Sequence, residues 1–149
     1  MPSSLTLTTL RDRVEAFLTD NSNAVWTTGT LEESVRLALH EYSLARPLRA
    51  IGPVTISTAA RAVALPSLTG LTGVDRVWYP YTAADPEYPP DWIEWSLFDN
   101  AGTFTLWLDV PAKPAVDEVI RVFYRKLHTL NGLDSATAST FEARDESLL

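Results

Sequence analysis

The sequence of 149 residues contains no cysteine, only two histidines and only six glycines. The lack of cysteine excludes disulfide bonds and thiolate metal sites, and it suits a cytoplasmic product. The glycines form neither G-x-G-x-x-G nor a phosphate loop, and no second histidine follows at the H-E-x-x-H spacing. No serine lies in a G-x-S-x-G motif. We therefore expect a protein that is not an enzyme and that holds no cofactor and no metal.

Long apolar runs and an excess of basic charge are also missing. No stretch approaches the roughly 20 apolar residues of a membrane helix, and the N-terminus lacks the pattern of a secretion signal. The formal net charge is −7, and residues 71–149 hold six basic and thirteen acidic residues, which is the whole excess. Because phosphate binding needs Lys and Arg to displace counterions, we expect no membrane partner and no sequence-specific binding of nucleic acid.

The strongest pattern that is present lies in residues 91–127, where three segments alternate apolar and polar side chains. Residues 99–102 and 111–114 supply turn residues between the segments. The pattern predicts an antiparallel meander with one face on a core and the other largely facing water. The apolar sides are Ile93, Trp95 and Leu97, then Phe104, Leu106 and Leu108, then Ile120, Val122 and Tyr124.

Two amphipathic helices are predicted before this sheet. Apolar residues at helical spacing indicate a first helix over residues 6–20. A second begins at Thr30, where T-L-E-E predicts a capping box with Glu33, and Pro47 ends it.

Further strands are predicted between the helices and the meander. Val54 and Ile56, then Val63 and Leu65, have the spacing of a small hairpin turning at residues 58–59. Residues 73–79 form another strand. Residues 79–92 contain four prolines and several aromatics, which favours an ordered surface loop over a central strand or a disordered linker.

The C-terminal residues predict a turn and the start of a helix. Asn131 and Gly132 form the turn, and Ser139 or Thr140 caps the helix. That helix is short, and its apolar ending at Leu148 and Leu149 predicts either a shortened sequence or an end that docks on another surface.

These elements together predict an α+β fold in one domain, residues 1–149. A helical part (1–48) precedes a β-rich part (50–128) and a C-terminal turn with the start of a helix (129–149). We expect two N-terminal helices packed on an antiparallel sheet of about five or six strands. The core residues expected to be buried are Leu10, Phe17, Leu39, Ile93, Leu106 and Val122.

Few side chains are candidates for chemistry. His40 is interpreted as a helix-end residue and His128 as a turn residue. The acidic pairs at 91 and 94, 117 and 118, and 145 and 146 are interpreted as solvated loop acids. The clustered aromatics are core, a contact surface or a sugar-stacking platform. The predicted protein-interaction surface comprises Trp78, Tyr79, Tyr81, Tyr88, Trp92, Phe141, Leu148 and Leu149.

The order of these elements resembles the head–tail adaptor (connector) proteins of tailed bacteriophages, in particular the tubular neck type. The features that carry the resemblance are the opening LTLTTLRDRVEAFL, the helix LEESVRLALHEYSLARP, the Leu65-Pro66 pair before the V-x-R-V strand at residues 74–77, and the ending HTLNGLDSATASTFEARDESLL. They cover most of the chain.

This resemblance implies a structural virion protein, assembled in the host cytoplasm. Such subunits form a homo-oligomeric ring, contact portal and tail proteins, and extend the channel through which DNA passes. The resemblance carries no catalytic residues. The alternative function is a small β-rich module that binds carbohydrate or protein through its aromatic loop.

Overall fold

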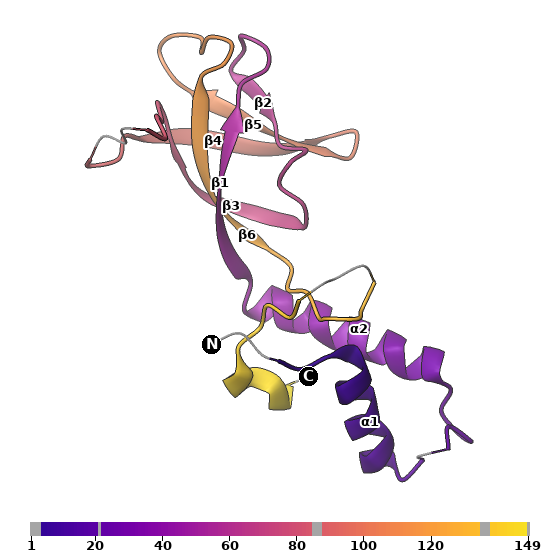
Figure 1. The fold of residues 1–149 in the computed structure, drawn as a ribbon. Helices are drawn as coiled ribbons and strands as arrows, with labels where there is room; N and C mark the ends of the chain where they lie inside the picture. The colour runs from indigo at the N-terminus through magenta and orange to yellow at the C-terminus, as the bar shows by residue number, and fades with distance from the viewer. Residues whose placement is uncertain (1–3, 21, 85–87, 135–137, 149) are drawn as a thin grey trace. The chain divides into compact units, whose positions relative to one another are not determined.

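The computed structural model describes residues 4–20, 22–84, 88–134 and 138–148, and it has the predicted α+β fold (Figure 1). The chain divides into two compact units. The sheet unit is Arg49–Lys126, and the helical unit combines Met1–Leu48 with Leu127–Leu149.

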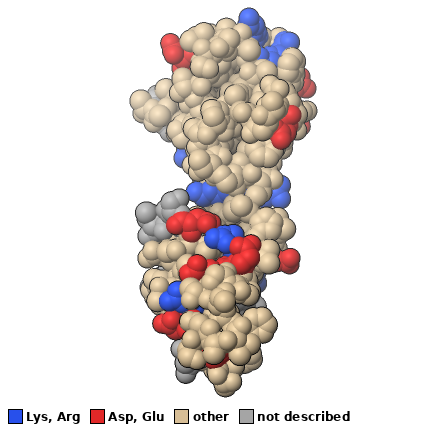
Figure 2. Space-filling model, turned by 90° about the vertical axis from the view of Figure 1, so that its right-hand side faces the viewer, with Lys and Arg blue, Asp and Glu red and all other residues tan. Residues whose placement is uncertain are grey.

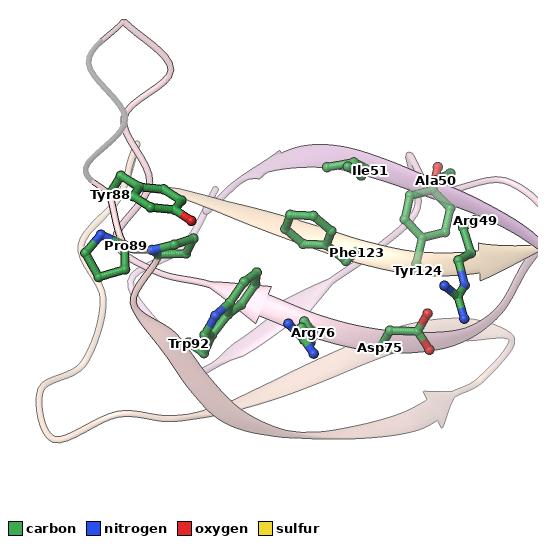
Figure 3. Close-up of a pocket in the computed structure, with 11 residues that line it drawn as sticks. Arg49, Ala50, Ile51, Asp75, Arg76, Tyr88, Pro89, Trp92, Phe123 and Tyr124 are labelled. Atoms are coloured by element: carbon green, nitrogen blue, oxygen red, sulfur yellow. The ribbon is translucent and has the colours of Figure 1, made fainter.

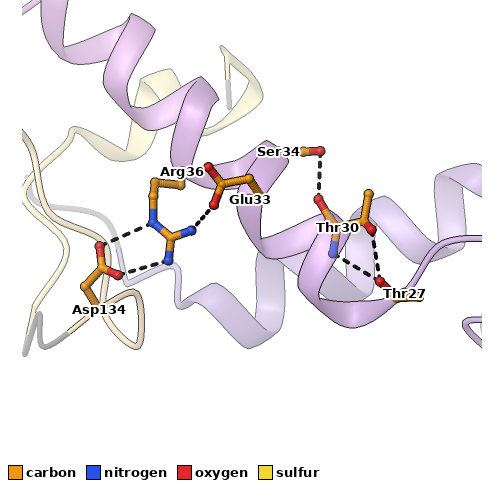
Figure 4. A network of polar contacts seen from close by, with 6 residues as sticks. All are labelled: Thr27, Thr30, Glu33, Ser34, Arg36 and Asp134. Carbon is orange, nitrogen blue, oxygen red and sulfur yellow. Dashed lines mark hydrogen bonds and ion pairs between the residues drawn. The ribbon is translucent and has the colours of Figure 1, made fainter.

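The helical unit contains α1 (Leu7–Leu18) and α2 (Thr28–Ala45). Thr6 caps α1 by accepting a hydrogen bond from the backbone N–H of Thr9 at 3.2 Å. Thr27 caps α2 in the same way, accepting from the N–H of Thr30 at 3.3 Å (Figure 4).

The predicted capping box at Thr30 and Glu33 is wrong, because α2 begins at Thr28, before both residues. The hydroxyl of Thr30 contacts that of Thr27 at 2.9 Å. Glu33 pairs with Arg36, and Arg36 also donates to Asp134 at 2.9 Å (Figure 4). The T-L-E-E pattern therefore lies inside the first turns of the helix, where its acid is used in an ion-pair network.

Both helices and the C-terminal segment contribute to the core of the helical unit. Leu10 and Leu39 are buried in it, as predicted, but Phe17 is 87% exposed and that prediction is wrong. Only the first turns of α1 reach this core, so apolar spacing alone does not ensure burial of the last turn. The core residues are Leu5, Leu7, Leu10, Val35, Leu39, Tyr42, Leu130, Leu133 and Phe141.

The sheet unit holds a six-stranded antiparallel sheet with strand order β1-β6-β3-β4-β5-β2 (Figure 1). Its strands are β1 (Leu48–Thr55), β2 (Ala62–Ala64), β3 (Leu71–Trp78), β4 (Trp92–Asn100), β5 (Thr103–Asp109) and β6 (Val119–Lys126).

This order confirms part of the predicted pairing and overturns the rest. β4 and β5 form the predicted hairpin. β6 does not continue it as a meander, because β6 lies between β1 and β3. The hairpin predicted for residues 54–65 is also wrong, since β1 and β2 lie at opposite ends of the strand order. Strand alternation predicts which residues face a core, but the choice of neighbouring strand depends on the whole sheet.

The side-chain alternation itself is largely confirmed. Leu106 and Val122 are completely buried, and Ile93 is partly buried against the same core. The alternation is imperfect in β5, where Phe104 is 37% exposed and Thr105 is buried. The alternation of side chains thus places one face of the sheet on the core and leaves the side chains of the opposite face more exposed to solvent.

The C-terminal segment ends in a short 3-10 helix, η1 (Ala143–Leu148), and its predicted caps are wrong. The Ser139 hydroxyl instead donates to the carbonyl of Leu5. The Thr140 hydroxyl accepts from the N–H of Thr129 at 2.8 Å. Both hydroxyls therefore fasten the C-terminal segment within the helical unit.

Candidate functional site

A groove of about 900 Å³ lies in the sheet unit (Figure 3). Arg49 and Asp75 lie toward one end, Tyr88 and Pro89 toward the other, and Phe123 lies between them (Figure 3). Strands β1, β3, β4 and β6 and the end of the proline-rich loop all contribute. The lining residues are Arg49, Ala50, Ile51, Asp75, Arg76, Tyr88, Pro89, Pro90, Trp92, Phe123 and Tyr124.

A β-bulge in β3 turns two consecutive charged residues outward. Val74 is opposite Tyr124 and Arg76 is opposite Phe123, so two steps along β3 correspond to one step along β6. Val74 and Val77 are both buried, whereas Asp75 and Arg76 are both exposed. Bulges commonly re-aim side chains in this way beside functional sites. This bulge brings Asp75 and Arg76 together into the groove lining.

The carboxylate in the groove is already paired. Arg125 donates from Nε to Asp75 at 2.9 Å. Its side chain lies over Gly73, where an added Cβ would be only 2.8 Å from the guanidinium. Gly73 therefore leaves the space that Arg125 occupies, and the pair neutralises Asp75.

Aromatic rings and guanidinium groups alternate beside and within the groove. The guanidinium carbon of Arg76 lies 5.2 Å from the ring centre of Trp92, which packs edge-on against Phe123 at 5.2 Å. The guanidinium carbon of Arg121 lies 5.0 Å from the ring centre of Tyr81 and 5.9 Å from that of Phe123. Such cation–π contacts hold arginine side chains extended over ring faces. The arrangement presents positive charge on an aromatic surface.

Among the described residues, most other arginines of the protein form ion pairs with carboxylates, whereas Arg49 and Arg76 do not. Within residues 4–20, 22–84, 88–134 and 138–148, neither has a carboxylate within ion-pair distance. Both side chains are solvent-exposed. They are therefore available to an anionic group of a ligand.

A hydrogen bond fastens the start of the proline-rich loop. The Tyr79 hydroxyl donates to Glu118 at 2.6 Å, and Glu118 also accepts from the N–H of Ala115 at 2.8 Å. Burial, with the Glu118 hydrogen bond, raises the pKa of Tyr79 to about 12. The same hydrogen bond from Tyr79 lowers the pKa of Glu118. Glu118 was expected to be a solvated loop acid, but its structural role is to hold this loop.

The residues of the predicted interaction surface fall into different environments. Tyr88 and Trp92 are 89% and 44% exposed and both line the groove. Trp78 is buried, whereas Tyr79 and Tyr81 are half-buried.

The C-terminal members of that predicted surface do not join the groove. Phe141 is completely buried in the core of the helical unit, so it presents no surface to a partner. The side chain of Leu148 and all of Leu149 lie outside the described part of the chain. The prediction that Phe141, an apolar residue near the acidic chain end, belongs to an exposed surface is therefore wrong.

A second exposed surface lies in the helical unit, at the connection between α1 and α2. Asp20 is only 8% exposed, and its carboxylate accepts from the N–H groups of Ala24, Val25 and Trp26 at 2.9, 3.0 and 2.7 Å. These hydrogen bonds, that of Trp26 first, lower the pKa of Asp20. The carboxylate thereby fixes the backbone of residues 24–26.

The end of α1, residues 25–26 and one side of α2 present apolar side chains to solvent. Phe17 is 87% exposed, Val25 74% and Trp26 45%. Leu37 and Leu44, seven residues apart and so on one side of α2, are 60% and 62% exposed. These exposed side chains form two groups, one at the end of α1 and just before α2 and one along α2, and together we call them the apolar surface of the helical unit: Phe17, Leu18, Val25, Trp26, Leu37 and Leu44. Sequence reasoning missed it because helical spacing assigned Phe17 to the core.

Asp145 corrects another expectation. It was interpreted as a solvated acid, but it is 6% exposed and accepts from the Tyr42 hydroxyl and from Arg46, both at 2.8 Å. The Tyr42 hydrogen bond, followed by Arg46, lowers its pKa. His128 contacts the Arg46 carbonyl at 2.8 Å and Thr140 at 3.1 Å. These polar groups hold η1 and the adjoining segment to α2.

On the face shown in Figure 2, acidic and basic side chains lie close together over the helical unit.

Within the described residues, no group of three or more His, Cys, Asp or Glu side chains is placed to hold a metal ion. Of the helices in that part of the chain, none has the length and apolar character required to cross a bilayer.

No protein-family model matches the chain, and no curated protein matches it significantly. Functional inference therefore depends on the groove of the sheet unit and on the apolar surface of the helical unit.

Proposed function

We propose that the protein is a structural subunit of a tailed-bacteriophage virion, a head–tail adaptor that joins the portal to the tail. The observation that carries the proposal is the apolar surface of the helical unit. The order of elements that resembles adaptor proteins agrees with this function. The chain acts in a homo-oligomeric ring, and its localisation is the virion.

The apolar surface has two properties of an interface. It includes exposed large side chains, among them Trp26 and Phe17, and aromatic residues are enriched at protein contacts. The part formed by Val25 and Trp26 is also fixed in advance by the Asp20 carboxylate. Preorganisation of this kind lowers the entropic cost of association.

Alternative explanations for such exposure are weaker. Single exposed apolar side chains are common and need no explanation. Here, however, Val25 and Trp26 are adjacent in sequence, and their backbone N–H groups both donate to the Asp20 carboxylate. Leu37 and Leu44 are exposed on the same side of α2. Repeated exposure on ordered backbone favours a contact with other subunits or with the portal.

The test combines the purified full chain with the portal protein encoded near its gene. Analytical ultracentrifugation and electron microscopy should detect rings or a complex, with an interface of about 1,200–2,000 Å² or more. A Phe17→Ser/Trp26→Ser variant should lose the assembly. Val116→Ser is the matched control, because Val116 is 50% exposed and lies in the sheet unit.

Stability must be measured alongside assembly. Replacing Phe17 should change the free energy of unfolding by less than about 0.5 kcal/mol, because the side chain is exposed. If the wild-type chain remains a monomer and does not bind the portal, or if no portal gene lies nearby, the adaptor function is wrong. Equal assembly by the double variant would reject the apolar surface as the interface.

A further inference from the structure

The groove of the sheet unit differs chemically from the apolar surface of the helical unit. It combines two arginines that lack ion-pair partners in the described chain with exposed aromatic and aliphatic side chains. The protein as a whole carries a net charge of −7. Positive charge left unpaired on an acidic protein points to an anionic ligand.

We propose that this groove binds an extended acidic segment of a partner protein. Carboxylates of the segment pair with Arg49 and Arg76, and an apolar side chain between them packs on Phe123 and Ile51. This proposal concerns the sheet unit alone and does not depend on the adaptor function.

The positions of the groove residues match such a segment. Arg49 lies toward one end, Arg76 lies nearer the middle, and Tyr88 and Trp92 line the opposite end (Figure 3). Ile51 is 51% exposed and Phe123 is half-buried, so the surface along the groove is accessible and apolar. A guanidinium presents a fork of donors that suits a carboxylate, and an extended chain spaces its side chains along the groove.

Arg76 is prepared for this role. Its stacking on Trp92 at 5.2 Å orients the guanidinium without neutralising its charge. The carboxylate next to it in the chain, Asp75, is paired with Arg125 at 2.9 Å. Asp75 therefore does not compete for Arg76, and a ligand carboxylate meets a charge that is oriented and has no ion-pair partner among the described residues.

Other ligand classes fit this chemistry less well. A nucleic acid strand presents many phosphates, whereas residues 49–126 contain seven basic and nine acidic residues, which is unfavourable for a polyanion. A neutral sugar requires acceptors as well as donors around an aromatic ring, but the groove carboxylate is occupied by Arg125. Two separated arginines on an apolar surface match alternating acidic and apolar side chains.

The experiment titrates the full chain with a fluorescently labelled peptide of alternating Glu and Leu, measured by anisotropy. The same peptide with Gln in place of Glu tests the need for charge. A ten-residue oligothymidylate and an oligogalacturonate test the competing anions. The protein variants are Arg49→Gln, Arg76→Gln and their combination, with Lys113→Gln as the control for loss of one exposed charge outside the groove.

We expect the Glu-containing peptide to bind and the Gln-containing peptide to bind at least about tenfold more weakly, since each charged hydrogen bond is worth a factor of this order. Each arginine variant should weaken binding about three- to tenfold, and the double variant more. Lys113→Gln should leave the affinity unchanged, and added salt should weaken binding.

Several results would overturn the proposal. These are the absence of peptide binding, equal binding of the Gln peptide, or equal binding by the double variant. Tighter binding of oligothymidylate or oligogalacturonate would assign the groove to another class of ligand. Circular dichroism of each variant verifies that the sheet is intact, and Arg76→Lys, which keeps the charge, should retain part of the affinity if the fold is unchanged.

Discussion

The helical unit and the sheet unit are stabilised in different ways. Within the described residues, the core cluster of the sheet unit contains fourteen buried residues and that of the helical unit nine, so the described part of the sheet unit buries more apolar side chains. Among the residues whose burial is described, five of the six buried polar or charged residues, including Glu15, Asp20 and Asp145, belong to the helical unit. Hydrogen bonds to Asp20 fix residues 24–26, and hydrogen bonds to Asp145 hold the C-terminal segment to α2. A smaller core is thus accompanied by more specific polar contacts.

Truncation of Phe141 should produce the largest effect and should act on the helical unit. Phe141→Ala removes a completely buried ring that packs edge-on against Tyr42 at 6.2 Å. We expect a loss of about 3–5 kcal/mol in the free energy of unfolding. Urea unfolding followed by circular dichroism at 222 nm reports the helices.

Tryptophan fluorescence provides the matching signal for the sheet unit, because four of the five tryptophans lie in residues 49–126. If the two units respond separately, Phe141→Ala shifts the circular dichroism transition much more than the fluorescence transition. Equal shifts of the circular dichroism and fluorescence transitions would show that the two units unfold together. The difference in stabilisation between the two units would then have no effect on unfolding.

Leu106→Ala is the corresponding change in the sheet unit. Leu106 is completely buried in the larger core, and the cavity should cost about 2–5 kcal/mol. Here the fluorescence transition should move more. A cost below about 0.5 kcal/mol, the size expected of a surface substitution, would contradict the strand register.

Acid should destabilise the helical unit more than the sheet unit, with an effect smaller than loss of a core side chain. The pKa values of Asp20 and Asp145 in the helical unit, and of Glu118 in the sheet unit, are lowered in the folded protein. A lowered pKa gives stability that is present above the unfolded-state value, about 4, and is lost as the pH falls through the folded-state value. Stability should therefore be constant near neutral pH and fall below about pH 4.

Thermal unfolding between pH 7 and pH 2.5 measures this dependence. Asp20→Asn removes one titrating carboxylate and should flatten the pH dependence of the helical signal. An unchanged pH profile in this variant would show that the hydrogen bonds from Ala24, Val25 and Trp26 to residue 20 do not depend on the negative charge of Asp20.

The smallest effect should come from the cap of α2, and it distinguishes two possible helix starts. Thr27→Ala should cost about 1 kcal/mol, because the Thr27 hydroxyl accepts the N–H of Thr30. Thr30→Ala, the control, should cost less, since Thr30 lies within the helix. The reverse order would restore the capping box that the sequence predicted.

Local patterns predicted much of the fold but less of the candidate sites. Helical spacing predicted α1 and α2, and alternation predicted the buried sides of β4 and β6. These patterns depend on neighbours within one element, so they are visible in the sequence. The aromatic cluster likewise indicated Tyr88 and Trp92, both of which line the groove.

The sequence by itself therefore determined the types of the elements, the inward face of most strands and the acidic balance of the chain. Only the tertiary structure decided that β6 lies between β1 and β3 and that Phe17 is exposed. It also decided that a bulge turns Asp75 and Arg76 to the same face, and that Asp145 is buried against Tyr42. These features depend on contacts between residues far apart in the chain. The periodic pattern of apolar residues within one helix or strand does not indicate which distant residue it contacts.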